Sequence, residues 1–143
     1  MIITEFTSYN PELKEIINKF LSQLVGTEYL ISKDQLEAII LDQNSHLFFA
    51  INAHGDYLGM ITVGTYIAPT GKKVWIEDVV VDEKFRGEGA GKALTNFAVQ
   101  FARDQQADVV MLTSKPERIN ANILYKKVGF QLRETNVYRM LLK

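Results

Sequence analysis

Apolar residues recur along this chain with helical spacing in some stretches and as short runs in others, which predicts alternating helices and strands. A helical spacing begins after Asn10 and Pro11, with asparagine as the N-cap and proline as the first helical residue, and it stops at Gly26. A capping-box sequence at residues 32–35 begins a second, shorter helix. Two further helices are predicted, one to about Gln106 and one closed by Gly129.

Short apolar runs bounded by turn residues predict the strands. They fall at residues 2–6, 47–51, 57–66, 74–81 and 109–112, and residues 130–132 and 137–142 predict a C-terminal hairpin. The run at 109–112 is continuously apolar, as in buried parallel strands, so the stretch from 74 to 112 predicts one right-handed βαβ unit. The predicted fold class is therefore α/β, a single layer with a mixed central sheet of about six to seven strands and about four helices.

Composition narrows the function classes. The 143 residues have the length of one domain, and a net charge of −1 gives no reason to expect nucleic acid or an anionic membrane as partner. The absence of cysteine excludes disulfides, thiolate nucleophiles and zinc–thiolate sites, and no metal site is expected. The first residues lack the pattern of a signal peptide, and no apolar run reaches the ~20 residues of a membrane span, so we expect a cytoplasmic protein.

The most informative segment joins the strand at 74–81 to the helix that follows. It places Gly87, Gly89 and Gly91 at the mouth of a helix, where free backbone N–H groups and the helix dipole attract phosphate. A nucleoside-triphosphate loop does not fit, because Arg86 stands where its first glycine belongs and Ala93 where a magnesium-binding hydroxyl belongs. A dinucleotide fingerprint also fails, since its third glycine would be Lys92.

The remaining pattern is Arg/Gln-x-x-Gly-x-Gly/Ala, matched by Arg86, Gly89 and Gly91. With it, the chain resembles the Gcn5-related N-acetyltransferase (GNAT) family. Residues 113–130 resemble that family's next segment, an asparagine-containing helix start followed by Leu/Phe-Tyr-x-x-x-Gly-Phe, here with Tyr125. The resemblance covers the element order of the whole chain and implies a single N-acetyltransferase domain over residues 1–143.

The resemblance implies acetyl-coenzyme A (acetyl-CoA) as acetyl donor, with its diphosphate on the loop N–H groups and its pantetheine along the preceding strand. That strand and the one at 109–112 must then splay apart. The implied cofactor-binding residues are Val79, Val80, Val81, Arg86, Gly87, Glu88, Gly89, Ala90, Gly91, Lys92, Asn120, Asn122 and Tyr125.

An amine must lose a proton before it attacks a thioester, and a carboxylate can take that proton directly or through water. Glu77 and Asp78 form the only acidic pair within the strand that leads to the loop, and alternation predicts that only one of them faces the groove. Similarity of this strand to the glucosamine-phosphate acetyltransferase branch favours Glu77, with Asp78 or water as alternatives. Tyr125 resembles the family tyrosine that protonates the departing thiolate. Trp75 we expect to be a core anchor, with a place in the lining of the acceptor pocket as the alternative.

The predicted function is transfer of acetyl from acetyl-CoA to a primary amine, by direct attack in a ternary complex. A small-molecule amine is favoured. The alternatives are a protein or peptide amine as acceptor, or a CoA-binding regulatory domain without turnover. Dimers are common in the family, so a homodimer stays open.

Overall fold

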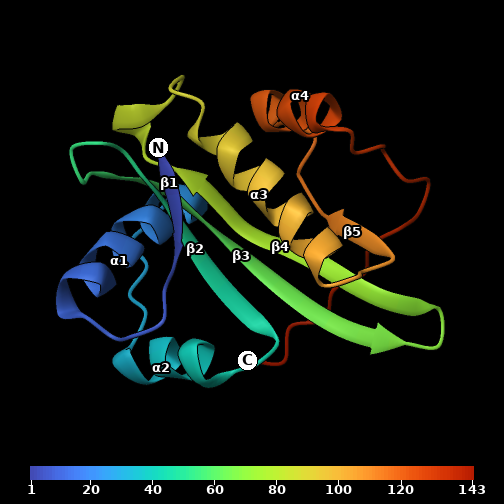
Figure 1. Ribbon diagram of the computed structural model, residues 1–143, viewed down its shortest axis with the longest axis horizontal. Helices are drawn as coiled ribbons and strands as arrows, with labels where there is room; N and C mark the ends of the chain where they lie inside the picture. Colours follow the sequence, from blue (N-terminus) through green and yellow to red (C-terminus); the bar gives the residue numbers. More distant parts are fainter.

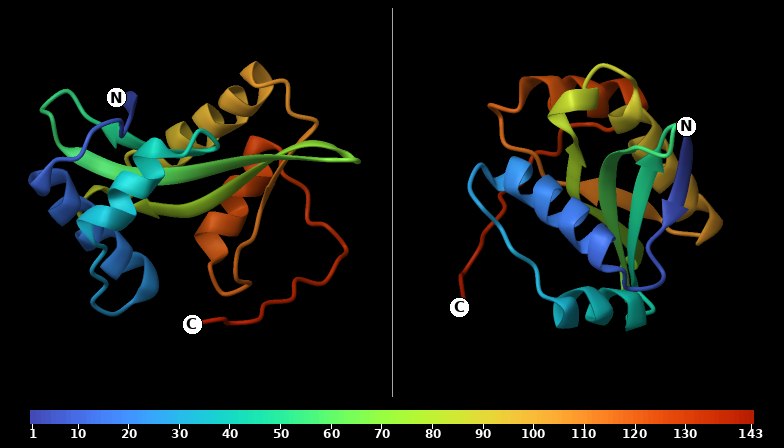
Figure 2. Two further views of the ribbon diagram at one scale, coloured as in Figure 1. Left: turned by 90° about the horizontal axis from the view of Figure 1, so that it is seen from below. Right: turned by 90° about the vertical axis from the view of Figure 1, so that its left-hand side faces the viewer.

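The computed structural model describes residues 1–143 and forms a five-stranded sheet with helices on both faces (Figures 1 and 2). The strands lie in chain order, with β1 to β4 antiparallel and β5 parallel to β4. The strands are β1 (Ile2–Glu5), β2 (Ser45–Ile51), β3 (Tyr57–Ala68), β4 (Gly71–Val81) and β5 (Val109–Leu112). The helices are α1 (Pro11–Val25), α2 (Lys33–Leu41), the 3-10 turn η1 (Glu83–Phe85), α3 (Ala90–Asp104) and α4 (Ile119–Val128).

The predicted helix ends are confirmed by their caps. The Asn10 side chain accepts a hydrogen bond from the backbone N–H of Glu12 at 2.7 Å, and Gly26 ends α1 in the left-handed region with φ 82°. Both bonds of the predicted capping box form between Ser32 and Gln35. None of the helices is long and apolar enough to cross a membrane.

Two hydrophobic cores lie on opposite faces of the sheet. Along β2, Phe48 and Ala50 enter the core under α3, whereas Leu47 and Phe49 enter the core under α1 and α2. This is the period of two that a strand imposes on its side chains. Both faces of β2 are therefore buried, which explains why its sequence is a continuous apolar run.

The C-terminal hairpin predicted at residues 130–132 and 137–142 is wrong, and the sheet accordingly has five strands rather than six or seven. Residues 131–143 form neither helix nor strand, and side chains such as Leu132 and Tyr138 are about nine-tenths exposed. The apolar run that suggested a strand is interrupted only by Arg139 between 137 and 142, so it lacks the alternation that would direct one face to a core.

Candidate functional site

The pairing between β4 and β5 ends halfway along β4. Their pairing runs from Lys73 and Val109 to Ile76 and Leu112, after which β4 continues to Val81 without a partner on this side. A cleft of about 980 Å³, here called the β4 cleft, opens beside the free part of the strand. The splayed pair of parallel strands that the sequence predicted is thus confirmed.

Most of the predicted cofactor-binding residues line this cleft. They are Val79, Val80, Val81, Arg86, Gly87, Gly89, Ala90, Gly91, Lys92, Asn120 and Tyr125. Glu88 is not among the lining residues. Asn122 points elsewhere, because its side-chain amide donates to the carbonyl oxygens of Lys115 at 2.9 Å and Arg118 at 2.8 Å. Asn122 therefore holds together the turn before α4 instead of lining the β4 cleft.

The glycine loop presents free donors to the β4 cleft. Gly89 is the N-cap of α3, has φ 87° and offers no side-chain cap, so the N–H groups of the first helical turn lack an acceptor in the helix. These N–H groups belong to Ala90, Gly91 and Lys92, all of which line the cleft. The loop thus combines unpaired donors with the positive end of a helix dipole, which is an arrangement suited to an anion.

α4 forms the opposite wall and packs tightly on the start of α3. A Cβ atom added at Gly91 would lie 3.2 Å from the Leu124 Cδ2 atom and 3.5 Å from the Val81 Cγ2 atom. This glycine therefore permits close approach of three elements, β4, α3 and α4, at the floor of the loop.

Tyr125 lies where two hollows meet. Its side chain is 6% exposed and packs edge-on against Phe130, with ring centroids 6.1 Å apart. It lines the β4 cleft and also a neighbouring hollow of about 1060 Å³ beside β5. Burial raises the pKa of the Tyr125 phenol, and the positive charge of Arg118 offsets only part of that effect. The phenol is therefore protonated at neutral pH and able to donate a proton.

A β-bulge sits at the acidic pair of β4. Met60 pairs with Val80 and Thr62 with Glu77, so two β4 residues oppose one residue of β3, and Asp78 has φ 49°. The bulge breaks the strict alternation along β4 that predicts only one carboxylate at the groove. Both acidic side chains are exposed, and neither is among the residues that line the β4 cleft.

The two carboxyl groups have perturbed acidities. Partial desolvation raises the pKa of Glu77, and the adjacent charge of Asp78 raises it further. Desolvation also raises the pKa of Asp78. A carboxylate with a raised pKa is a stronger base than an ordinary surface carboxylate, which suits proton abstraction.

Comparison with known proteins identifies the family. The family model described as the acetyltransferase (GNAT) family matches residues 10–130. The chain belongs to the GNAT family.

Individual relatives agree with this membership. Streptothricin acetyltransferase from Streptomyces lavendulae is 34% identical over 89 residues, 62% of this chain and 46% of the relative. Human N-acetyltransferase 8 is 27% identical over 119 residues, 78% of this chain and 52% of the relative. The matched stretch thus spans about half the length of these curated relatives.

Solved structures share the GNAT fold of this chain. An aminoglycoside acetyltransferase, meta-AAC0020 from an uncultured soil metagenomic sample, superposes with a TM-score of 0.84 at 18% identity, over 99% of this chain and 96% of its own. Glucosamine-6-phosphate N-acetyltransferase from Arabidopsis thaliana superposes with a TM-score of 0.77 at 20% identity, over 98% and 99% of the two chains.

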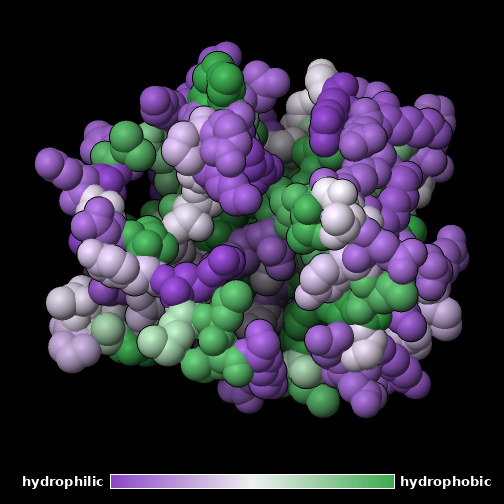
Figure 3. All heavy atoms as spheres, turned by 180° about the vertical axis from the view of Figure 1, so that it is seen from behind, coloured by the Kyte–Doolittle hydropathy of each residue, from purple (hydrophilic) through white to green (hydrophobic).

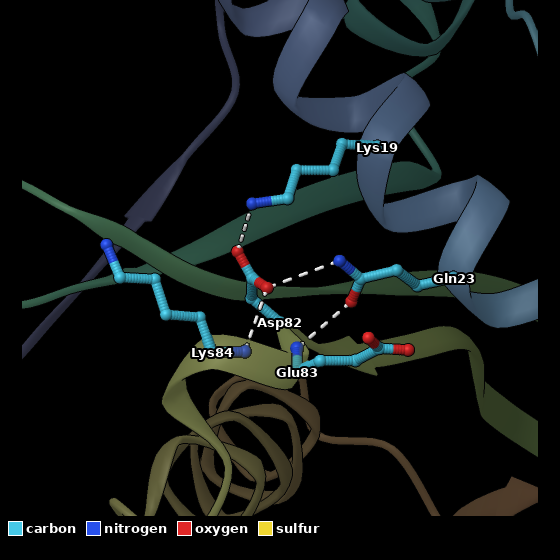
Figure 4. Close-up of polar contacts among 5 residues, drawn as sticks. All are labelled: Lys19, Gln23, Asp82, Glu83 and Lys84. Atoms are coloured by element: carbon cyan, nitrogen blue, oxygen red, sulfur yellow. Dashed lines mark hydrogen bonds and ion pairs between the residues drawn. The ribbon is translucent and has the colours of Figure 1, made fainter.

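The sequence did not predict one polar cluster of this GNAT chain, which forms around Asp82. Asp82, only 3% exposed, accepts hydrogen bonds from the Lys19 ammonium at 2.6 Å, the Gln23 amide at 3.2 Å and the Lys84 backbone N–H at 3.1 Å (Figure 4). Gln23 in turn accepts from the Glu83 backbone N–H at 3.1 Å. Two α1 side chains one turn apart thereby fasten α1 to the turn before the glycine loop. The sequence shows that Lys19 and Gln23 share one face of α1, but it does not show that both bind Asp82.

This cluster fixes one wall of the β4 cleft, because Gln23 and Leu24 line it. Burial alone would raise the pKa of Asp82, but the hydrogen bonds from Lys19, Lys84 and Gln23 and the charge of Lys19 outweigh it, so the pKa is lowered. Because the pKa of Asp82 is lower in the folded than in the unfolded state, its carboxylate stabilises the fold at any pH above the unfolded-state pKa. That stabilisation is lost as the pH falls through the folded-state pKa.

Replacing Lys19→Met leaves the buried Asp82 carboxylate without its cation. We expect a loss of about 2 kcal/mol in the free energy of unfolding at neutral pH, and a smaller further loss on acidification than in the parent. Urea denaturation at pH 7 and pH 3.5 measures both effects. The control is Lys33→Met, which breaks an exposed 3.8 Å pair with Glu37 and is expected to cost under about 0.5 kcal/mol. Equal losses in the two variants would contradict the role given to Lys19.

Proposed function

We propose that this protein transfers an acetyl group from acetyl-CoA to the primary amine of a small molecule. The observation that carries the proposal is the β4 cleft, in which an unpaired strand edge leads into an uncapped helix N-terminus. GNAT enzymes in general use acetyl-CoA, which supplies the activated acetyl group as a thioester.

The residues present fit acetyl-CoA at both polar parts of the molecule. The N–H groups of Gly87 and of residues 89–92 suit the diphosphate, whereas the Glu88 N–H donates to the Phe85 carbonyl oxygen. The positive φ of Gly87 and Gly89, 87° each, turns the backbone so that it can approach phosphate without a Cβ in the way. Arg86 and Lys92 border the same cleft and add positive charge. The free backbone edge of β4 at residues 79–81 offers hydrogen bonds to the pantetheine amides, as a neighbouring strand would.

Two protein groups serve the proton movements. Glu77, directly or through a water molecule, takes the proton from the ammonium form of the acceptor. A backbone N–H of β4 beside the bulge can stabilise negative charge on the reacting carbonyl oxygen. Tyr125, which is held protonated by its raised pKa, donates the proton that the departing thiolate needs. No covalent intermediate on the protein is required, because the amine attacks directly.

A small-molecule acceptor is favoured by the names of two similar proteins. Streptothricin acetyltransferase and the aminoglycoside acetyltransferase are both named for small amine-bearing substrates. These two names support a small amine as acceptor, and the β4 cleft supports acetyl transfer as the reaction.

The test is a panel of amine acceptors assayed for thiol release from acetyl-CoA, with the acetylated product identified by mass spectrometry. The panel contains polyamines, aminoglycosides, arylalkylamines and a lysine-containing peptide. Acetylation of at least one small amine is expected. Acetylation of the peptide alone would indicate a protein acceptor, and acetyl-CoA binding without transfer to any amine would indicate a CoA-binding domain without turnover.

The raised pKa values of the acidic pair predict a pH dependence. Because only the carboxylate form accepts a proton, kcat/KM should fall as pH drops through a value above the usual range of a glutamate. Glu77→Gln should lower kcat about 100-fold, the size of a general-base contribution, and abolish that acid limb. Asp78→Asn, one residue away on the bulge, is the matched control and should retain most activity. The reverse result would assign the base to Asp78.

A further inference from the structure

The sheet face under α1 and α2 is only partly covered. Its core ends at Met60 on β3 and Val80 on β4. Beyond that point the same face carries Thr62, Gly64 and Tyr66 from β3, paired respectively with Glu77, Trp75 and Lys73 from β4. Figure 3 views the molecule from this side and shows a hollow in the middle of the face, bordered by hydrophobic and hydrophilic side chains.

Trp75 is the largest side chain on this open strip and belongs to neither hydrophobic core. The expectation that it anchors the core is therefore wrong. Its indole N–H donates to the Tyr66 hydroxyl at 3.3 Å, and Tyr66 is 47% exposed. On the β5 side Trp75 is in register with Met111. A row of large apolar side chains thus crosses three strands, and we call Tyr66, Trp75 and Met111 the aromatic floor.

Trp75 and Met111 line the hollow of about 1060 Å³ beside β5, whose far wall is the C-terminal segment from Gln131 to Val137. Gly64 is the β3 partner of Trp75, and a Cβ atom added there would meet nothing within 4 Å. The flank of the indole next to Gly64 is therefore free of protein atoms at that position. A half-buried tryptophan next to a glycine, with its only polar atom already bonded, offers a flat apolar surface to a ligand.

The floor has a fixed relation to the proposed base. Trp75 and Glu77 are two residues apart on the same face of β4, so their Cα atoms are separated by about 7 Å along the strand. The carboxylate therefore lies at the end of the floor nearer the free part of β4, although Glu77 itself does not line the β4 cleft. A ligand whose ammonium group meets Glu77 can lay a flat group on Trp75 if two or three atoms join the two parts.

We infer that the aromatic floor binds the body of the acceptor, and that the acceptor class is a primary amine with a flat apolar group two or three atoms from its nitrogen. This inference rests on the proposed function and specifies its substrate. The floor itself offers a polyhydroxylated amine little hydrogen bonding, because the Trp75 indole N–H already donates to the Tyr66 hydroxyl.

The experiment compares kcat/KM for 2-phenylethylamine, spermidine and glucosamine in the parent protein, Trp75→Ala and Trp75→Phe. We expect 2-phenylethylamine to be the best acceptor. Trp75→Ala should lower its kcat/KM about 30-fold, as truncation of a central aromatic contact does, mainly through KM. The KM for acetyl-CoA should not change, and Trp75→Phe should restore most of the loss. Tyr138→Ala, an exposed aromatic of the C-terminal segment, is the matched control and should have no effect.

Three results would overturn the inference while leaving the proposed function intact: a preference for spermidine, a preference for glucosamine, or an equal effect of Trp75→Ala on all three amines. Absence of transfer to every amine, together with absence of acetyl-CoA binding by calorimetry, would instead overturn the proposed function and the inference with it.

Discussion

Tyr125→Phe is expected to lower kcat by about 100-fold, because it removes the phenol that we propose as proton donor to the thiolate while keeping the ring. The ring accounts for the packing against Phe130, so folding and the shape of the β4 cleft should be retained. Since the lost interaction acts on the departing group, the KM for acetyl-CoA should change little. Steady-state kinetics with a saturating amine acceptor measures both constants.

The pH profile adds a second readout for the same substitution. Burial raises the pKa of Tyr125, so the parent should lose activity only above the usual range of a tyrosine, where the phenol ionises. The variant should lack that alkaline limb. Tyr138→Phe makes the same chemical change at an exposed position and should behave like the parent. Full activity of Tyr125→Phe across the pH range would show that another group is the acid.

Gly89→Val is expected to raise the KM for acetyl-CoA by at least about tenfold, since a branched side chain at φ 87° forces the N-cap of α3 out of its conformation. The N–H groups that follow it would then no longer converge on one point. The expected loss of folding stability is about 1–3 kcal/mol, the usual cost of such backbone strain. Acetyl-CoA titration by calorimetry and urea denaturation measure the two effects separately.

Gly55→Val separates strain from binding. Gly55 has nearly the same φ, 85°, and equally open surroundings, but it lies in the turn between β2 and β3. This control should lose similar stability while keeping the parent KM for acetyl-CoA. If both variants raise the KM equally, the effect of Gly89 comes from general destabilisation and the loop has no special role.

The helices and most strands could be predicted because their signals are local. Asn10 and Gly26 bound α1 through hydrogen bonds and a backbone conformation that these residue types favour. The glycine loop was recognisable for the same reason, since its function depends on backbone geometry that the sequence encodes directly. The direction of a single side chain is not encoded in this local way. The Asn122 amide, predicted to face the cofactor, donates instead to the carbonyl oxygens of Lys115 and Arg118.

Long-range pairings account for what the sequence did not reveal. The bulge at Asp78 depends on the register of β4 against β3, and the Lys19–Asp82 pair joins residues 63 positions apart. Trp75 looked like a core residue because tryptophan is usually well buried, yet the face it occupies is left open by α1 and α2. The C-terminal run had the composition of strands without the alternation that fixes a face.

Whether acetyl-CoA occupies the β4 cleft can be measured by titrating isotope-labelled protein with acetyl-CoA and recording two-dimensional amide NMR spectra. We expect the largest shifts on the backbone N–H groups of Val79, Val80 and Val81 and of residues 87–92. Shifts confined to the hollow beside β5, or shifts no larger than those produced by an equal concentration of acetate, would contradict binding in the β4 cleft.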